Sequence, residues 1–229
     1  CISFRRTRVS RNTQRFYTGT GWKARNMRKN LRKDLFVISK LINDKEKILD
    51  VGCGSGNLLD FLLKTKQAIC RGIEISQSGV NDCVKKGLSV IQGDANYDLD
   101  DYPDDAFSTV ILSQTIQAMI FPDTVIKNLI RIGRRAIISF PNFGYWKVRK
   151  DLMLKGKMPK NDILPYEWFD TPNIHLCSCK DFQIFCKNNN IIIEKFMCLS
   201  EKGIEMKTNY FSNLLAYQVI FCVSKNNKN

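Results

Sequence analysis

Residues 47–56 read Lys47-Ile48-Leu49-Asp50-Val51-Gly52-Cys53-Gly54-Ser55-Gly56, an apolar run that ends in an aspartate and three alternating glycines. The run predicts a buried strand, and the glycines predict a tight turn whose backbone can approach a ligand without Cβ clashes. Leucines at helical spacing follow from Asn57 to Lys64, so the turn leads into a helix N-terminus with free N–H groups. The spacing G-x-G-x-G differs from the G-x-G-x-x-G of dinucleotide sites.

Strand and helix patterns alternate outward from this unit. Apolar runs predict strands at 47–51, 69–75, 88–91, 109–112 and 135–140, and helical spacing predicts helices at 31–42, 57–64, 76–87 and 122–133. Later, Ser178 is placed to cap a further helix, and two final strands are expected at 191–196 and 217–223 with no helix between them. This order predicts an α/β fold with a Rossmann-like, doubly wound, mostly parallel seven-stranded sheet and an antiparallel edge strand.

The charge is unevenly distributed along the 229 residues. The net charge is +14, and residues 1–26 carry seven basic residues and no acid. This segment lacks periodicity, so we expect a disordered arm at 1–26 and a single domain at 27–229, with Met27 as the natural start. Apolar runs are too short to span a bilayer, and we see no secretory signal, so we expect a cytoplasmic protein that binds no membrane.

Nine cysteines are present, which is an odd number in a chain long enough to bury a core without disulfides. We therefore expect reduced, mostly buried thiols. Cys177-x-Cys179 lacks the spacing of metal ligands, and no second pair or histidine cluster completes a site, so we expect no metal.

Three acids follow the first three strands of the expected sheet. Asp50 precedes the glycines and suits a ligand with a cationic aminoacyl end; Glu74 can accept from ribose hydroxyls, and Asp94 from an adenine amine. Acids at successive strand carboxyl ends define the crevice where open α/β sheets bind ligands. The combination predicts a site for S-adenosylmethionine (SAM) or S-adenosylhomocysteine (SAH).

The glycine loop, together with Gly72-Ile73-Glu74-Ile75 and Gln92-Gly93-Asp94-Ala95, resembles the class I SAM-dependent methyltransferases. More narrowly, residues 27–223 are similar to the MetW family, on stretches such as Ser139-Phe140-Pro141-Asn142-Phe143-Gly144 and Thr171-Pro172-Asn173-Ile174-His175-Leu176-Cys177. Residues 1–26 depart from the family pattern. The predicted cofactor-binding set is Asp50, Gly52, Cys53, Gly54, Gly56, Glu74, Ile75, Asp94, Ala95 and Ser113.

The resemblance implies a role in methionine biosynthesis as a partner of a homoserine O-acyltransferase (MetX-like), and it does not imply a methylated substrate. The alternative is a SAM-dependent methyltransferase that acts on a small-molecule acceptor, so whether the chain is itself an enzyme stays open. His175, the single histidine, is the candidate catalytic base, with a structural role in its turn as the other interpretation.

Nucleic acid is not an expected partner, although the charge is basic. The position after the fourth strand reads Ser113-Gln114-Thr115-Ile116, where base-amino methyltransferases carry a Pro-Pro-aromatic turn. The sequence also lacks a Pro-Cys dipeptide that could supply the nucleophile for cytosine chemistry.

The region 141–177 is aromatic, basic and punctuated by prolines. Its aromatic residues could roof a ligand pocket or anchor a partner, and a lid packed on the core is the equal alternative. The basic run from Lys147 to Lys160 is interpreted as a solvated helix face, with anion or partner binding second.

Overall fold

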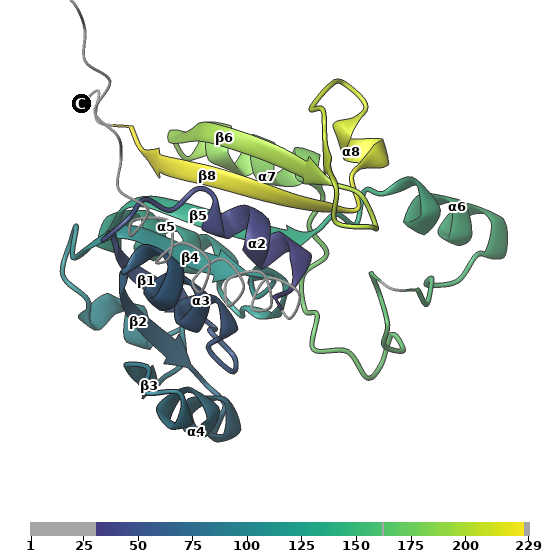
Figure 1. Ribbon diagram of the computed structural model, residues 1–229. Coiled ribbons are helices and arrows are strands. Elements are labelled where there is room, and N and C mark those ends of the chain that lie inside the picture. The colour runs from purple at the N-terminus through teal and green to yellow at the C-terminus, as the bar shows by residue number, and fades with distance from the viewer. Residues whose placement is uncertain (1–30, 162, 227–229) are drawn as a thin grey trace, which may run out of the picture.

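The computed structural model describes residues 31–161 and 163–226, and its centre is one sheet in the order β3-β2-β1-β4-β5-β8-β6-β7 (Figure 1). The strands are β1 (Lys47–Val51), β2 (Ile69–Glu74), β3 (Val90–Gln92), β4 (Phe107–Ser113), β5 (Gly133–Pro141), β6 (Ile191–Leu199), β7 (Glu205–Met206) and β8 (Gln218–Lys225). The α-helices are α2 (Lys33–Ser39), α3 (Asn57–Lys66), α4 (Gln77–Lys85), α5 (Pro122–Ile132), α6 (Trp146–Lys155), α7 (Cys179–Asn188) and α8 (Ser212–Leu215). The arm expected at 1–26 lies outside the described residues.

The sheet has eight strands, so the expected count of seven is wrong. The additional strand, β7, has two residues and pairs with Cys198 and Leu199 of β6. Two residues are too short to show the alternation that reveals a strand in sequence. The expected antiparallel edge is confirmed: β3, β2, β1, β4 and β5 run parallel, whereas β8, β6 and β7 continue the sheet antiparallel.

The central strands β1, β4 and β5 are buried on both faces because their apolar side chains point alternately to either side. Leu49 and Val51 of β1 join the core cluster under α5 and α7, whereas Ile48 joins the cluster under α2 and α3. Helices on both faces are the arrangement that near-continuous apolar strands require. In the part of the chain that the structure covers, no helix is both long and apolar enough to cross a bilayer.

The local signals for helix ends are found in the structure. The Ser76 hydroxyl accepts from the N–H of Gly79 at the start of α4. Ser178 and Asp181 form a reciprocal capping box at the start of α7, which satisfies two backbone N–H groups. These caps fix where each helix begins relative to the sheet.

The chain leaves the sheet between β5 and α7, and α6 lies to the side of it (Figure 1). Phe143, Tyr145 and Val148 pack with Ile163 and Leu164 in a small separate cluster. Farther along, Trp168 and Phe169 are 75% and 71% exposed. The first half of the region therefore packs on the domain, and its later half presents aromatic side chains to solvent.

Candidate functional site

The glycine loop joins β1 to α3 at the carboxyl edge of the parallel strands. Gly52, Gly54 and Gly56 all have positive φ, a backbone conformation that favours glycine. A Cβ at Gly56 would lie 2.5 Å from Leu88, so packing excludes a side chain there. A Cβ at Gly54 would meet nothing within 4 Å. Gly54 therefore faces open space, where a ligand can contact the backbone.

Glu74, at the carboxyl end of β2, holds this loop in place. Its Oε2 accepts from the N–H of Gly54 at 2.7 Å, and its Oε1 accepts from the N–H of Ser76 at 3.0 Å. Glu74 is 8% exposed, and each carboxylate oxygen keeps a further lone pair. The side chain can thus order the loop and still accept from a ligand hydroxyl.

Asp50 is buried in the same crevice, with 3% of its surface exposed. Burial raises its pKa to about 7; Arg32 opposes this shift, and Glu74 adds to it. Among the described residues, no hydrogen bond to the Asp50 carboxylate stabilises its charged form. A cationic ligand group here would supply the missing partner, because an unpaired buried carboxylate is costly.

The third acid and its neighbour are held in a turn. Asp94 Oδ1 accepts from the backbone N–H and the side-chain amide of Asn96, at 2.9 and 2.8 Å. Ala95 packs against the core. Ile75, next to Glu74, is 64% exposed and offers an apolar surface at the crevice rim. Pairing of Glu74 with Gln92 sets the ends of β2 and β3 side by side.

Cys53 lies in the loop, with its thiol turned inward. A Cβ at Gly72 would lie 2.7 Å from Cys53 Sγ, so the thiol fills the space that this glycine leaves. Burial raises its pKa well above the usual range for a thiol. Such a thiol is inert, and the contribution of Cys53 to a ligand would come from its backbone. The eight cysteines of the described residues are free, and no metal-ligand cluster occurs among those residues.

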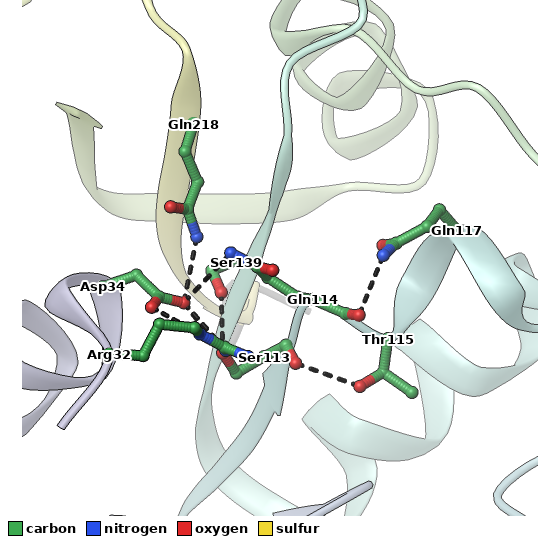
Figure 2. A network of polar contacts seen from close by, with 8 residues as sticks. All are labelled: Arg32, Asp34, Ser113, Gln114, Thr115, Gln117, Ser139 and Gln218. Atoms are coloured by element: carbon green, nitrogen blue, oxygen red, sulfur yellow. Dashed lines mark hydrogen bonds and ion pairs between the residues drawn. The ribbon is translucent and has the colours of Figure 1, made fainter. Parts of the chain in front are cut away.

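Ser113 ends β4 inside a polar network centred on Asp34 of α2 (Figure 2). Asp34 is 1% exposed, and its two carboxylate oxygens accept from Nε and Nη2 of Arg32, at 2.6 and 2.9 Å. Its Oδ2 also accepts from Ser113 at 3.2 Å and from the Gln218 amide at 2.9 Å. Ser113 is therefore engaged within the protein.

Strand alternation explains why these polar groups meet. Ile111, Ile137 and Ile220 all point into the core cluster under α2. Two residues farther toward the carboxyl edge, the same face carries Ser113, Ser139 and Gln218. The α2 face of the sheet thus changes from apolar to polar where α2 begins.

His175 lies in a different cavity, of about 190 Å³, between α5 and α7. Its backbone N–H donates to Gln117 O at 3.0 Å. This cavity is lined mainly by apolar side chains such as Ile126 and Phe182. The structure brings Asp50, Glu74 and the glycine loop together, and it places His175 apart from them.

Sequence reasoning missed Arg32 as a site residue. It lies just before a short helix and belongs to no motif that would mark it as part of a ligand site. The guanidinium interacts with both Asp50 and Asp34, and it donates to Ser113 at 2.6 Å. Its Nη1 has no bond to another described residue. Arg32 therefore places a positive charge near Asp50 in the crevice, and its Nη1 is available to donate to the carboxylate of a ligand.

Comparisons with known proteins agree with this architecture. A family model for methionine biosynthesis protein MetW matches residues 32–223. The bifunctional methionine biosynthesis protein MetXA/MetW of Rhodopirellula baltica is 31% identical over 174 residues, which cover 72% of this chain and 28% of that relative. The chain therefore spans less than a third of the relative's length.

Two solved structures show the same fold. One is a SAM-dependent methyltransferase of Thermotoga maritima, described as a possible histamine N-methyltransferase, with a TM-score of 0.60 at 17% identity. The superposition covers 94% of this chain and 95% of the chain of that protein. The [4+2]-cyclase SpnF has a TM-score of 0.57 at 15% identity and covers 84% of this chain and 80% of its own. Proteins described by different chemistries share this fold, so the fold does not specify the reaction.

Replacing Asp34 with alanine should lower the free energy of unfolding by about 2–3 kcal/mol, since Arg32, Ser113 and Gln218 lose a buried acceptor. Urea unfolding measures the change. The control is Asp123→Ala, because Asp123 pairs with Lys127 on the surface, where a loss below about 1 kcal/mol is expected. Equal losses in the two variants would contradict a central role for Asp34.

Asp50→Asn should stabilise the ligand-free protein above pH 7. The folded-state pKa of about 7 exceeds the ordinary pKa of an aspartate, 3.8, so the wild-type protein loses stability as the pH rises between these values. At about 1.4 kcal/mol per pKa unit, the gain in the variant is on the order of 2–4 kcal/mol at pH 8. Thermal melting at pH 8 and pH 4.5 measures it; a gain of the same size at both values would show that ionisation is not its cause.

Proposed function

The chain belongs to the MetW family of methionine biosynthesis proteins, and from this membership we propose that it is a SAM-binding subunit that partners a homoserine O-acyltransferase. The proposal has two parts, a ligand and a partner. They rest on different observations and fail independently. The proposal places both proteins in the cytoplasm, a reducing compartment that fits the free thiols of the eight described cysteines.

Asp50, which is buried and whose carboxylate accepts no hydrogen bond from the described residues, supports the ligand part. SAM has an aminoacyl end with an ammonium and a carboxylate. Asp50 would take the ammonium and Arg32 Nη1 the carboxylate, while Glu74 would accept from the ribose. The open backbone at Gly54 leaves room for this approach, and the exposed Ile75 would contact the adenine. Each ligand group then meets a side chain of complementary chemistry.

The relative from Rhodopirellula baltica supports the partner part, because its name joins MetXA and MetW in one chain. Tethering two domains raises their effective concentration, which compensates for weak affinity. Where the two proteins are separate chains, the same association needs a contact surface. The exposed pair Trp168 and Phe169, with ring centroids 5.6 Å apart, is a candidate, since aromatic residues dominate interface hot spots.

The second candidate function is methyl transfer to a small molecule. A cavity of about 310 Å³ at the ends of β4 and β5 favours it. Thr115, which lies in sequence between the lining residues Gln114 and Gln117, packs against Gly52 of the glycine loop. Methyl transfer needs positioning, and a base where the acceptor must lose a proton. His175 is the predicted base, and its place in the α5–α7 cavity gives this function less support than the partner role.

Gly54→Val should reduce the affinity for SAM and SAH at least tenfold, because the added side chain would occupy the space that the ligand needs. Calorimetry measures the affinity. The matched control is Gly87→Val: Gly87 also has positive φ and open surroundings, but it follows α4, away from the carboxyl edge. Both variants should lose similar stability. If the two variants bind SAM equally well, the ligand site is wrong.

Wild-type chain should co-purify with a homoserine O-acyltransferase of the same organism and raise its turnover. Replacing Trp168 and Phe169 together by alanine should weaken that association about tenfold or more. Tyr210 and Phe211 form the control, since they are a second exposed pair with centroids 5.5 Å apart, next to α8. If the wild-type chain neither co-purifies nor changes turnover, methyl transfer becomes the leading function.

A further inference from the structure

A cavity of about 460 Å³ lies between α6, α7 and α8 and reaches β6. Arg149 of α6, Lys180 of α7 and Phe196 of β6 line it, together with the turn that leads into α8. None of its lining residues belongs to the glycine loop or to the acids of the cofactor crevice. Neither of the functions proposed above uses it as a ligand site.

Asn142, directly after β5, is fully buried and fixes the walls of this cavity. Its Oδ1 accepts from the N–H groups of Gly144, just before α6, and Cys179, in α7, at 3.1 and 3.0 Å. Its Nδ2 donates to the backbone oxygens of Asn213 and Ala216, in and after α8, at 3.0 and 2.8 Å. All four bonding positions of the amide are used, so the three helices are held together before a ligand arrives.

Two positive charges border the cavity, and both are accessible. Lys180 is exposed, and its ammonium makes no hydrogen bond or ion pair with another described residue. Arg149 is also exposed; its Nε donates to Gly144 O at 2.5 Å, whereas its Nη1 and Nη2 have no partner in the described part of the chain. No acidic residue occurs in the described lining. An anion would therefore meet two counter-charges and no repelling carboxylate there.

The two cationic residues are anchored beside the same side chain. A Cβ at Gly144, whose carbonyl holds Arg149, would lie 2.7 Å from Asn213 Oδ1. The same oxygen accepts from the backbone N–H of Lys180 at 3.2 Å. Arg149 and Lys180 are thus close in space although they come from different helices, and their positive potentials add over the cavity.

Exposed aromatic side chains also border the cavity. Tyr210 is 95% exposed and Phe211 56%, and their ring centroids lie 5.5 Å apart. Two bonds close the turn that carries them. Asn209 Oδ1 accepts from the N–H of Phe211, and Ser212 Oγ accepts from the N–H of Asn209, both at 2.8 Å. Rings on a turn that is held in this way offer faces on which another planar ring can stack.

We propose that this cavity binds a nucleoside monophosphate. The phosphate pairs with Arg149 and Lys180, because its two negative charges match theirs and because Nη1 and Nη2 of Arg149 form a fork that suits phosphate oxygens. The base stacks on the rings of Tyr210 and Phe211. The volume of about 460 Å³ lies within the roughly 300–1,000 Å³ of small-ligand pockets, which leaves room for a nucleoside beside the phosphate.

The test titrates the full chain, saturated with SAH, with adenosine monophosphate (AMP), adenosine and inorganic phosphate. NMR chemical shifts of the backbone amides report binding and its place. AMP should shift the amides of residues 209–213. It should also bind about tenfold or more tightly than adenosine or phosphate, because each of these probes lacks one half of the ligand.

Lys180→Gln should weaken AMP binding about tenfold, because it removes a charge-assisted hydrogen bond. Lys187→Gln is the matched control. It removes the same charge from the same helix, but Lys187 does not line the cavity, so AMP binding should stay unchanged. Lys180→Arg keeps the charge and should retain AMP binding, which separates a lost charge from a damaged fold.

Four results would overturn the proposal: no binding of AMP, adenosine binding as tightly as AMP, displacement of SAH by AMP, or equal AMP affinity of Lys180→Gln and Lys187→Gln. The last result would show unspecific attraction to a basic protein. Without SAH, Gly54→Val should bind AMP as wild type does, and a loss there would place AMP in the cofactor crevice.

The site is independent of the proposed function, and the same variants show this. Lys180→Gln should keep wild-type affinity for SAH and wild-type co-purification with the acyltransferase, because Lys180 lies in neither of the sites proposed for them. Failure of the nucleotide site is therefore distinct from failure of the proposed function.

Discussion

The carboxylate of Asp34 is the constraint on which the carboxyl edge of this sheet depends. It is buried, so it must be paired, and its partners are Arg32 just before α2, Ser113 of β4 and Gln218 of β8. Gln218 is 184 residues away in sequence. The carboxylate therefore ties the first described helix to the last strand across the centre of the sheet. The edge that presents ligand-binding groups is complete only when α2 and β8 have both folded onto it.

Two consequences follow from this one buried charge. Arg32, held by Asp34, lies close enough to Asp50 to oppose the rise in its pKa, so the network extends into the cofactor crevice. The same carboxylate accepts from the amide nitrogens of Gln114 and Gln218, two residues that line the neighbouring cavity. One acid thus orders side chains of both the crevice and the cavity beside it.

Local pattern predicted the parallel half of the fold because its central strands β1, β4 and β5 are largely buried on both faces and because helices such as α4 carry an N-cap and an apolar stripe. It also placed Asp50 and Glu74 together, since the carboxyl ends of parallel strands share one edge. The pattern could not predict β7, which has two residues, or the contacts that join Asp34 to Ser113 and Gln218, 79 and 184 positions away. The inward turn of the Cys53 thiol depends on the absence of a side chain at Gly72, on a different strand.

The chemistry of the cavity at the ends of β4 and β5, which Gln114, Gln117 and Gln218 line, bears on whether this fold transfers a methyl group here. An ammonium has no lone pair, so it must lose a proton before it can attack a methyl donor. Amide oxygens accept hydrogen bonds but do not take up a proton near neutral pH, and the described lining holds no carboxylate or histidine. An acceptor that must lose a proton would therefore find no base in the described lining of this cavity. This lining gives methyl transfer to such an acceptor less support than the proposed role of a partner subunit.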